Sequence, residues 1–357
     1  MDWFARRLLR WFDSHGRKDL PWQRGSDAYR VWLSEIMLQQ TQVATVIPYF
    51  ERFIDRFPTV ADLASAGADE VLHHWTGLGY YARARNLHHT ARQVVQEHAG
   101  QFPQQPSELE QLPGIGRSTA AAIAAIAYGR RAAILDGNAK RVLARYHAVP
   151  GHPGQSGTLK TLWARAEDHT PARRVADYTQ AIMDLGATLC TRTRPACSRC
   201  PVAERCEALA RNAVERYPER RPARDKPERR ARMYLFVDAA GACLLERRPP
   251  DGLWGGLWTP PERSADSELE TLCREFGIAL DSVIRHHAAP AFRHTFTHFH
   301  LDIEPVYVFL SSRPQAVADG AGLIWYEPEA PEAVGLSAPA AKLLNSIADQ
   351  REEFRLT

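Results

Sequence analysis

Four cysteines form the densest group of chemically active side chains in the sequence. Cys190, Cys197, Cys200 and Cys206 are spaced C-x6-C-x2-C-x5-C, and a proline directly follows the third. Four thiolates from one short loop suit tetrahedral zinc or a cubane iron–sulfur cluster, because both take soft anionic ligands. Structural zinc ribbons usually combine two C-x2-C pairs, and here there is one. The spacing favours iron–sulfur modestly over zinc, and a metal over four ordinary core cysteines.

A second candidate for chemistry is Glu35, which lies in the segment VWLSEIMLQQT (31–41). Its immediate neighbours are mostly apolar, which indicates a buried position on a helix. Burial disfavours the ionised form of a carboxyl group, and a glutamate that stays neutral near pH 7 can act as a general acid. The alternative is a glutamate that reaches solvent from the edge of its helix, and the residues alone leave both open.

A second carboxylate, Asp136, follows two apolar residues in the segment ILDGNAKRV (134–142). The Asp-Gly pair indicates a turn that opens a helix. On the residues alone, a plain N-cap is the simpler interpretation of this aspartate. A catalytic carboxylate is the alternative.

Two glycines, Gly114 and Gly116, lie in the segment LPGIGRST (112–119) between two predicted helical stretches. Glycines at that place allow the backbone to approach a phosphate, and the amides of a helix N-terminus bind anions. A plain connection between two helices is the other interpretation.

These segments, with SEIMLQQTQ (34–42), together resemble the endonuclease III and MutY family of DNA glycosylases. The resemblance implies that Gly114 and Gly116 belong to a helix-hairpin-helix motif that binds the DNA backbone. It implies that the four cysteines hold one 4Fe-4S cluster as a cofactor. It also implies that Glu35 protonates the leaving adenine and that Asp136 is the catalytic aspartate.

The same resemblance assigns further residues. It implies that Asn138 belongs to the catalytic segment, that Arg141 contacts DNA, and that Gln40 and Tyr80 wedge the base stack while the target base is flipped out. Endonuclease III-like enzymes place a lysine at position 118 because an amine forms the Schiff base of strand cleavage. Ser118 stands there in this chain. The serine at this position therefore predicts a monofunctional enzyme, which hydrolyses the N-glycosidic bond and leaves an abasic site.

The C-terminal part resembles a nudix domain, through segments such as LWGGLWTPPE (253–262) and LCREFG (272–277). Only Arg274 and Glu275 match the metal-binding array of nudix hydrolases, so we expect this domain to bind without hydrolysing. The resemblance implies that Phe296, Thr297 and His298 recognise 8-oxoguanine. Without it, a strand with alternating surface histidines is the simpler interpretation.

The elements that must position these residues follow from the apolar pattern. Helical periodicity predicts an all-α domain over 1–211, and a segment rich in proline and charge predicts a linker over 212–228. Short apolar runs predict an α+β domain over 229–357, with strands at 233–237, 242–246, 300–309 and 323–326 and helices near 268–276 and 338–348. The resemblance implies that the first is a glycosylase domain and the second a nudix-like domain.

Composition is that of a soluble chain of 357 residues, 45% hydrophobic and 24% charged, with a net charge of +3. Its longest apolar stretch, 119–128, is too short to cross a bilayer. Residues 190–230 carry twelve basic and six acidic side chains, which suits a phosphate backbone or a solvated linker. The family resemblance implies that the partner is double-stranded DNA with A:8-oxoG or A:G mispairs. We expect the chain to bind it as a cytoplasmic monomer without membrane contact.

Two other functions remain open at this stage. An endonuclease III-like pyrimidine glycosylase and lyase is opposed by Ser118 and by the second domain. A non-catalytic iron–sulfur DNA-binding protein is opposed by the presence of both Glu35 and Asp136.

Overall fold

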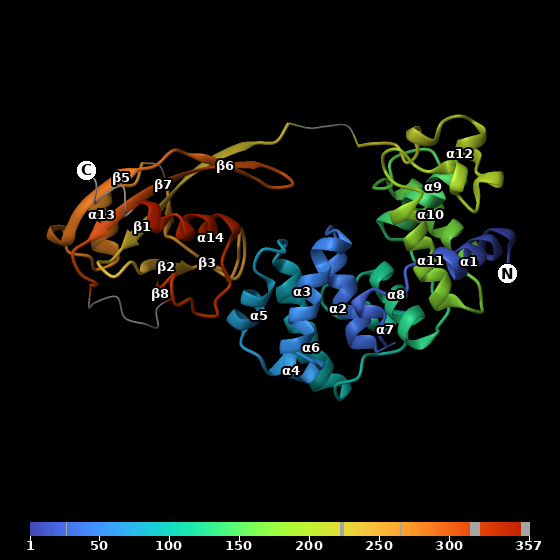
Figure 1. The fold of residues 1–357 in the computed structure, drawn as a ribbon, viewed down its shortest axis with the longest axis horizontal. Coiled ribbons are helices and arrows are strands. Elements are labelled where there is room, and N and C mark those ends of the chain that lie inside the picture. Colours follow the sequence, from blue (N-terminus) through green and yellow to red (C-terminus); the bar gives the residue numbers. More distant parts are fainter. Residues whose placement is uncertain (26, 222–224, 265, 315–321, 351–357) are drawn as a thin grey trace. The chain divides into compact units, whose positions relative to one another are not determined.

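The computed structural model describes residues 1–25, 27–221, 225–264, 266–314 and 322–350 (Figure 1). Two compact units are present: Met1–Ser65 with Arg85–Ala223, and Ala66–Ala84 with Arg224–Thr357. The predicted domain boundaries stay a prediction, and residues 222–224 of the predicted linker lie outside the described residues. The two compact units differ from the predicted domains in one respect: residues 66–84 pack with the C-terminal part of the chain.

The first unit is helical, which confirms the predicted fold class. Its α-helices are α1 (Trp3–His15), α2 (Ala28–Leu38), α3 (Val43–Arg56), α4 (Val60–Ser65), most of α6 (Ala82–His98), α7 (Pro106–Leu109), α8 (Arg117–Tyr128), α9 (Gly137–Tyr146), α10 (Ser156–His169), α11 (Val175–Thr188) and α12 (Glu207–Ala210). Short 3-10 helices are η1 (Pro21–Gln23), η2 (Cys197–Arg199), η3 (Ala203–Arg205) and η4 (Val214–Arg216).

Helix α8 lies at the centre of this unit. Its sequence RSTAAAIAAIAY has small side chains, and it ends at Gly129, whose φ of 64° is left-handed. The alanines let neighbouring backbones approach closely, and α8 packs against both α2 and α11. Helix α9 packs against α11 in turn. The helix that carries Glu35 and the helix that follows Asp136 are thereby assembled around one alanine-rich scaffold.

The second unit contains an eight-stranded sheet with the order β3-β2-β1-β7-β5. The strands β1 (Glu228–Val237) and β7 (His300–Leu310) run parallel, and β4 (Glu262–Arg263), β6 (Phe292–Thr295) and β8 (Leu323–Tyr326) pair with β1, β7 and β2. The other strands are β2 (Cys243–Arg247), β3 (Trp258–Thr259) and β5 (Val283–Ala288), and the helices are α5 (Ala68–Trp75), α13 (Leu269–Glu275) and α14 (Ala338–Asn345), with the 3-10 helix η5 (Leu280–Ser282).

The pairing of β1 with β7 inside the sheet explains why the sequence predicts both of these strands. Their apolar halves, such as Tyr234 to Val237 opposite Val306 to Phe309, are buried and read as continuous apolar runs. Leu272 of α13 and Phe276, directly after that helix, belong to the same core. The α+β class is confirmed, together with the four predicted strands and both predicted helices. None of the described helices is long and apolar enough to span a membrane.

Candidate active site

Glu35 lies on α2 at the wall of an open pocket. The helix begins after Asp27, whose side chain accepts a hydrogen bond from the backbone N of Tyr29. Glu35 is half-buried, and the pocket that it lines has a volume of about 370 Å³. Trp22 and Ile126 are among the apolar residues of the wall. Volumes of ~300–1,000 Å³ are typical of small-molecule sites, so a single base is a suitable occupant.

The electrostatics of the pocket keep the Glu35 carboxyl protonated. Burial raises the pKa of Glu35 to about 8, and the negative charge of Asp136 raises it further. Burial also raises the pKa of Asp136, but hydrogen bonds from Ala139 and Asn138 and the positive charge of Arg141 oppose that effect. The pKa values of both carboxyl groups are raised by burial, but only at Asp136 do hydrogen bonds and a nearby guanidinium oppose the rise.

Asp136 is the N-cap of α9, as the simpler interpretation of the sequence predicts. Its Oδ1 accepts a hydrogen bond of 2.7 Å from the backbone N of Ala139, and its Oδ2 accepts one of 3.2 Å from Nδ2 of Asn138. The Oγ of Ser118 accepts a hydrogen bond of 3.2 Å from the backbone N of Leu135. The two hydrogen bonds to the Asp136 carboxylate hold it at the N-terminus of α9, where the positive end of the helix dipole stabilises its negative charge.

Arg141 connects this turn to the cysteine loop. Its guanidinium donates to Oδ1 of Asn138 and to the carbonyl O of Gly186, both at 2.7 Å, and to the carbonyl O of Cys190 at 2.7 Å. The side chain is half-buried and bonded to the chain's own acceptors. Its contact with DNA stays a prediction, and its hydrogen bond to the cysteine loop is a feature that the sequence did not indicate.

Gly186 is a residue that sequence analysis missed. It lies on α11, and a Cβ atom added there would stand 2.6 Å from Cβ and 3.0 Å from Cα of Asn138. Such distances are too short for two carbon atoms, so only glycine allows α9 to approach α11 here. The single signal in the sequence was a glycine within a helical pattern, which is weak evidence on its own.

We expect Gly186→Ala to lower the activity of this site by about tenfold or more, because the added methyl group displaces Asn138. The matched control is Gly157→Ala on α10, where an added Cβ meets nothing within 4 Å. Alanine has the higher helix propensity, so neither change is expected to weaken its helix intrinsically. Single-turnover rates and melting temperatures of both variants test the prediction. Equal rates for Gly186→Ala and the parent chain would contradict it.

The hairpin predicted to contact the DNA backbone lies between α7 and α8. Gly114 has a φ of 77°, and a Cβ added there would stand 2.9 Å from Cβ of Asn86. Gly116 is the N-cap of α8 and supplies no side-chain cap. The turn thus requires glycine at 114 and presents the first amides of α8, which is the arrangement that binds phosphate.

The two predicted wedge residues have unusual backbone conformations. Gln40 follows α2 with a φ of 59°, and Tyr80 precedes α6 with a φ of 51°. Both side chains are exposed, and the Tyr80 side chain is large and apolar. Left-handed backbone is uncommon for residues other than glycine and is concentrated at functional sites. The two residues belong to different compact units.

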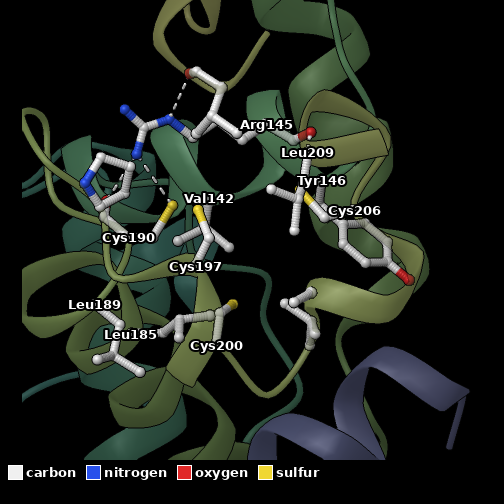
Figure 2. Close-up of a pocket in the computed structure, with 14 residues that line it drawn as sticks. Val142, Arg145, Tyr146, Leu185, Leu189, Cys190, Cys197, Cys200, Cys206 and Leu209 are labelled. Atoms are coloured by element: carbon white, nitrogen blue, oxygen red, sulfur yellow. Dashed lines mark hydrogen bonds between the residues drawn. The ribbon is translucent and has the colours of Figure 1, made fainter. Parts of the chain in front are cut away.

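The four cysteines line one pocket at the end of α11, through η2 and η3 to α12 (Figure 2). Arg145 is 3% exposed and donates to the Sγ of Cys190 at 3.3 Å. Among the described residues, no three His, Cys, Asp or Glu side chains are arranged as ligands of a metal ion. The remaining wall is mostly apolar and includes Val142, Tyr146, Leu185, Leu189 and Val202.

The predicted lesion-reading residues lie in the hairpin between β6 and β7. The backbone N of Phe296 donates to the carbonyl O of Phe299 at 2.9 Å, which closes a tight turn. Thr297 and His298 are exposed in that turn, whereas Phe299 is buried. The hydroxyl and the imidazole are therefore presented to solvent from a turn that is anchored by aromatic packing.

Sequence analysis did not identify two residues that hold this hairpin. The ring of Trp254, which has a φ of 55°, lies 5.5 Å from that of Phe296. The Nζ of Lys226 donates to the carbonyl O of Phe296 at 2.8 Å. A tryptophan between turn glycines and a lysine in a basic segment carry no local signal for such a role.

The acidic side chains of the nudix-like domain are engaged by an arginine. Arg263 donates to Glu246 at 2.8 Å and to both carboxylate oxygens of Glu275. Both carboxylates are thus paired with one guanidinium. The expectation that the domain binds without hydrolysing stays a prediction.

Comparisons with known proteins place this architecture in a class. Residues 33–168 match the HhH-GPD superfamily of base excision DNA repair proteins, and residues 232–346 match the NUDIX domain family. A solved thermostable thymine-DNA glycosylase is 28% identical with a TM-score of 0.53, covering 58% of this chain and 95% of that one. An endonuclease III–DNA complex shares the fold at 20% identity and a TM-score of 0.50, covering 59% and 95% of the two chains. Fold and site define a helix-hairpin-helix DNA glycosylase.

Curated relatives then narrow the class. The adenine DNA glycosylase of Buchnera aphidicola subsp. Acyrthosiphon pisum is 35% identical over 344 residues, which are 96% of this chain and 97% of that protein. The human adenine DNA glycosylase is 34% identical and covers 98% of this chain, with 74% of its own length matched. The chain belongs to the adenine DNA glycosylase family, and the predicted family and enzyme class are confirmed.

Proposed function

We propose that this enzyme removes adenine paired with 8-oxoguanine or guanine from double-stranded DNA and leaves an abasic site in an intact strand. The observation that carries the proposal is Glu35, a half-buried carboxyl group with a pKa near 8 at the wall of a base-sized pocket. Adenine is a poor leaving group until a ring nitrogen is protonated. A protonated carboxyl group in a base-sized pocket meets that need.

The two carboxyl groups divide the reaction between them. Glu35 donates its proton to the leaving adenine, and Asp136 stabilises the positive charge that develops on the sugar. Asn138 orients Asp136 through the hydrogen bond of 3.2 Å between their side chains. Gln40 and Tyr80 enter the base stack when the adenine leaves the duplex, since both are exposed on left-handed backbone.

The product is an unbroken strand because Ser118 supplies a hydroxyl group. Its Oγ accepts the hydrogen bond from Leu135, next to the catalytic carboxylate. A hydroxyl cannot form the imine with the sugar aldehyde that strand cleavage requires. The enzyme acts on DNA as a monomer, with Gly114, Gly116 and Arg141 at the phosphate backbone. None of its six cysteines is in a disulfide, which suits the reducing cytoplasm.

Cys190, Cys197, Cys200 and Cys206 hold one 4Fe-4S cluster. The donor set is four thiols around one pocket, and burial raises the pKa of the Cys200 thiol to about 12. Four thiolates this close therefore need a cationic group between them, and thiolate-only sites suit iron–sulfur clusters. When bound, the cluster orders the loop that Arg141 and Arg145 connect to α9.

We expect the purified protein to be brown and to contain about four irons per chain. Cys200→Ser is expected to lose iron, DNA binding and thermal stability together, because ligation organises the loop. Cys243→Ser is the matched control, since Cys243 is a buried cysteine of the sheet. Iron and zinc analysis of protein produced in unbiased medium provides the measurement. Stoichiometric zinc without iron would exclude the cluster.

The turn at 296–298 recognises the oxidised guanine. 8-Oxoguanine differs from guanine by an added carbonyl oxygen and a protonated N7, which a hydroxyl and an imidazole can read through directed hydrogen bonds. Thr297 and His298 present those two groups at the exposed turn. Thr297 stands where the family usually has serine and keeps the hydroxyl.

We expect the double variant Thr297→Ala, His298→Ala to reduce the preference for A:8-oxoG over A:G by about tenfold, which corresponds to ~1.4 kcal/mol of lost discrimination. The exposed pair Arg285 and His286 on β5, changed to alanine, is the control for altered charge in the same unit. Binding and single-turnover rates on both mispairs provide the measurement. Equal losses on the two substrates would show that the turn supports general affinity and not lesion recognition.

A substrate panel tests the proposed function as a whole. Duplexes with A:8-oxoG, A:G, A:T or thymine glycol are incubated with the enzyme and analysed before and after alkali. We expect release of adenine from the first two, with strand breaks only after alkali. Activity on thymine glycol with breaks before alkali would instead support an endonuclease III-like lyase. Binding without base release would support a non-catalytic protein.

A further inference from the structure

The loop that presents Tyr80 is part of the same compact unit as the C-terminal sheet. This loop, Thr76–Tyr81, is called the wedge loop below, and it joins α5 to α6. Gly77, Gly79 and Tyr80 all have left-handed backbone, with φ values of 95°, 76° and 51°. Gly77 and Gly79 adopt this backbone without strain, whereas Tyr80 keeps it only where its surroundings hold the loop.

The segment Val334–Leu336, which precedes α14, holds the wedge loop on both sides of Tyr80. The hydroxyl of Tyr81 donates to the carbonyl O of Leu336 at 2.9 Å and accepts from the backbone N of Gly77 at 3.2 Å. The backbone N of Leu336 donates to Oγ1 of Thr76 at 3.4 Å. Tyr81 is 8% exposed, so its hydroxyl bonds are shielded from water.

Helix α5, which precedes the wedge loop, also has close contacts with the C-terminal sheet. Oδ1 of Asp69 accepts hydrogen bonds of 3.2 Å from Arg247 on β2 and from the indole of Trp258 on β3. A Cβ added at Gly335 would stand 2.5 Å from Cβ of Leu72, so the two backbones meet where only glycine fits. The helix and the wedge loop are thus held by the strands of the C-terminal domain.

The 334–336 segment is in turn an extension of the sheet. Leu336 forms a parallel bridge with Trp258 of β3, and the backbone N of Trp258 donates to the carbonyl O of Gly335 at 2.8 Å. From β3 the sheet continues through β2 and β1 to β7, which carries the 296–298 turn. Hydrogen-bonded structure is therefore continuous from the lesion-reading turn to the wedge loop.

We propose that Tyr81 is a positioning residue that couples recognition of the lesion to insertion of Tyr80 into the base stack. This inference rests on the proposed function. The hydroxyl of Tyr81 holds the wedge loop against the 334–336 segment, so that binding of 8-oxoguanine at the turn favours the loop geometry that extrudes the adenine. Contacts between the turn and 8-oxoguanine thereby accelerate extrusion of the adenine. Such coupling requires a rigid connection between the turn and the wedge loop.

Tyr81→Phe removes only the hydroxyl and tests the coupling. Tyr234→Phe is the matched control, because the buried Tyr234 also donates one hydroxyl bond, of 3.0 Å to the carbonyl O of Ser267, within the same unit. The measurements are single-turnover rates on A:8-oxoG and A:G, and the fluorescence of 2-aminopurine in place of the target adenine. We expect Tyr81→Phe to slow A:8-oxoG about tenfold and A:G about twofold, with a smaller fluorescence rise, and Tyr234→Phe to match the parent.

A double-mutant cycle separates coupling from a purely structural role. In the parent chain, Thr297→Ala with His298→Ala should reduce the lesion preference about tenfold, and in the Tyr81→Phe background it should reduce it no more than about twofold. Losses that multiply independently, or a Tyr81→Phe enzyme with parental rates, would overturn the inference. If Tyr81→Phe does not fold, Thr76→Val removes the acceptor for Leu336 and takes its place in the cycle.

The parent chain in the same assays distinguishes a failure of the proposed function from a failure of the coupling through Tyr81. A parent that releases no adenine from A:8-oxoG overturns the proposed function, and this inference falls with it. A parent that is active and prefers 8-oxoguanine, combined with independent losses, overturns the coupling through Tyr81 alone.

Discussion

Glu35→Gln is expected to release adenine about a thousandfold more slowly than the parent chain, the loss that removal of a general acid causes. Glutamine keeps the shape of the side chain and its fit to the pocket, but its amide is far too weak an acid to protonate the leaving base. Binding to an A:8-oxoG duplex with an uncleavable 2′-fluoro target nucleotide should change by less than about threefold. Single-turnover rates and binding isotherms on the same preparation provide the two measurements.

The control for this variant is Glu51→Gln, which makes the same change at an exposed position on α3. It should retain the parental rate. A Glu35→Gln enzyme that keeps more than a tenth of the parental rate would remove Glu35 from the role of proton donor.

Asp136→Asn is expected to lower the rate about a hundredfold or more, because it removes the negative charge that stabilises the developing positive charge on the sugar. Asparagine is a good N-cap and can still accept the hydrogen bond from Ala139, so α9 should remain intact. An unchanged melting temperature together with the lost rate would identify a charge effect. Asp55→Asn, at an exposed position on α3, is the control and should behave like the parent.

Two outcomes would contradict this role for Asp136. One is near-parental base release by Asp136→Asn. The other is a loss of rate that only follows a loss of folding, because Asp136 would then act as a helix cap alone.

Local sequence features were sufficient to predict some of the site. Glu35 among apolar neighbours and Asp136 before a glycine each indicate a helix position directly, and the structure has them on α2 and at the start of α9. Apolar neighbours indicated the burial of Glu35 as one of two possibilities, and in the structure burial raises the pKa of its carboxyl group. These features depend on residues within one turn of the chain, which is the range over which pattern arguments hold.

The features that could not be predicted depend on residues far apart in the sequence. The contact between Gly186 and Asn138 joins two helices, and the packing of 66–84 with the C-terminal strands depends on hydrogen bonds across more than 200 residues. The left-handed backbone at Gln40 and Tyr80 is equally invisible, since neither residue type favours it. Tertiary structure decides these positions, and local sequence patterns give at most a weak signal for them.

The pH dependence of adenine release tests the two-carboxylate account most directly. Glu35 must be protonated to act, so the single-turnover rate on A:8-oxoG should fall as pH rises through about 8, by about tenfold per further pH unit. Asp136 must be ionised, and because its pKa is raised, the rate should also fall on the acid side, at a higher pH than for an ordinary aspartate. A bell-shaped profile with its alkaline limb near pH 8 is the predicted result. A rate that stays constant from pH 7 to pH 10 would contradict Glu35 as the acid and with it the central claim.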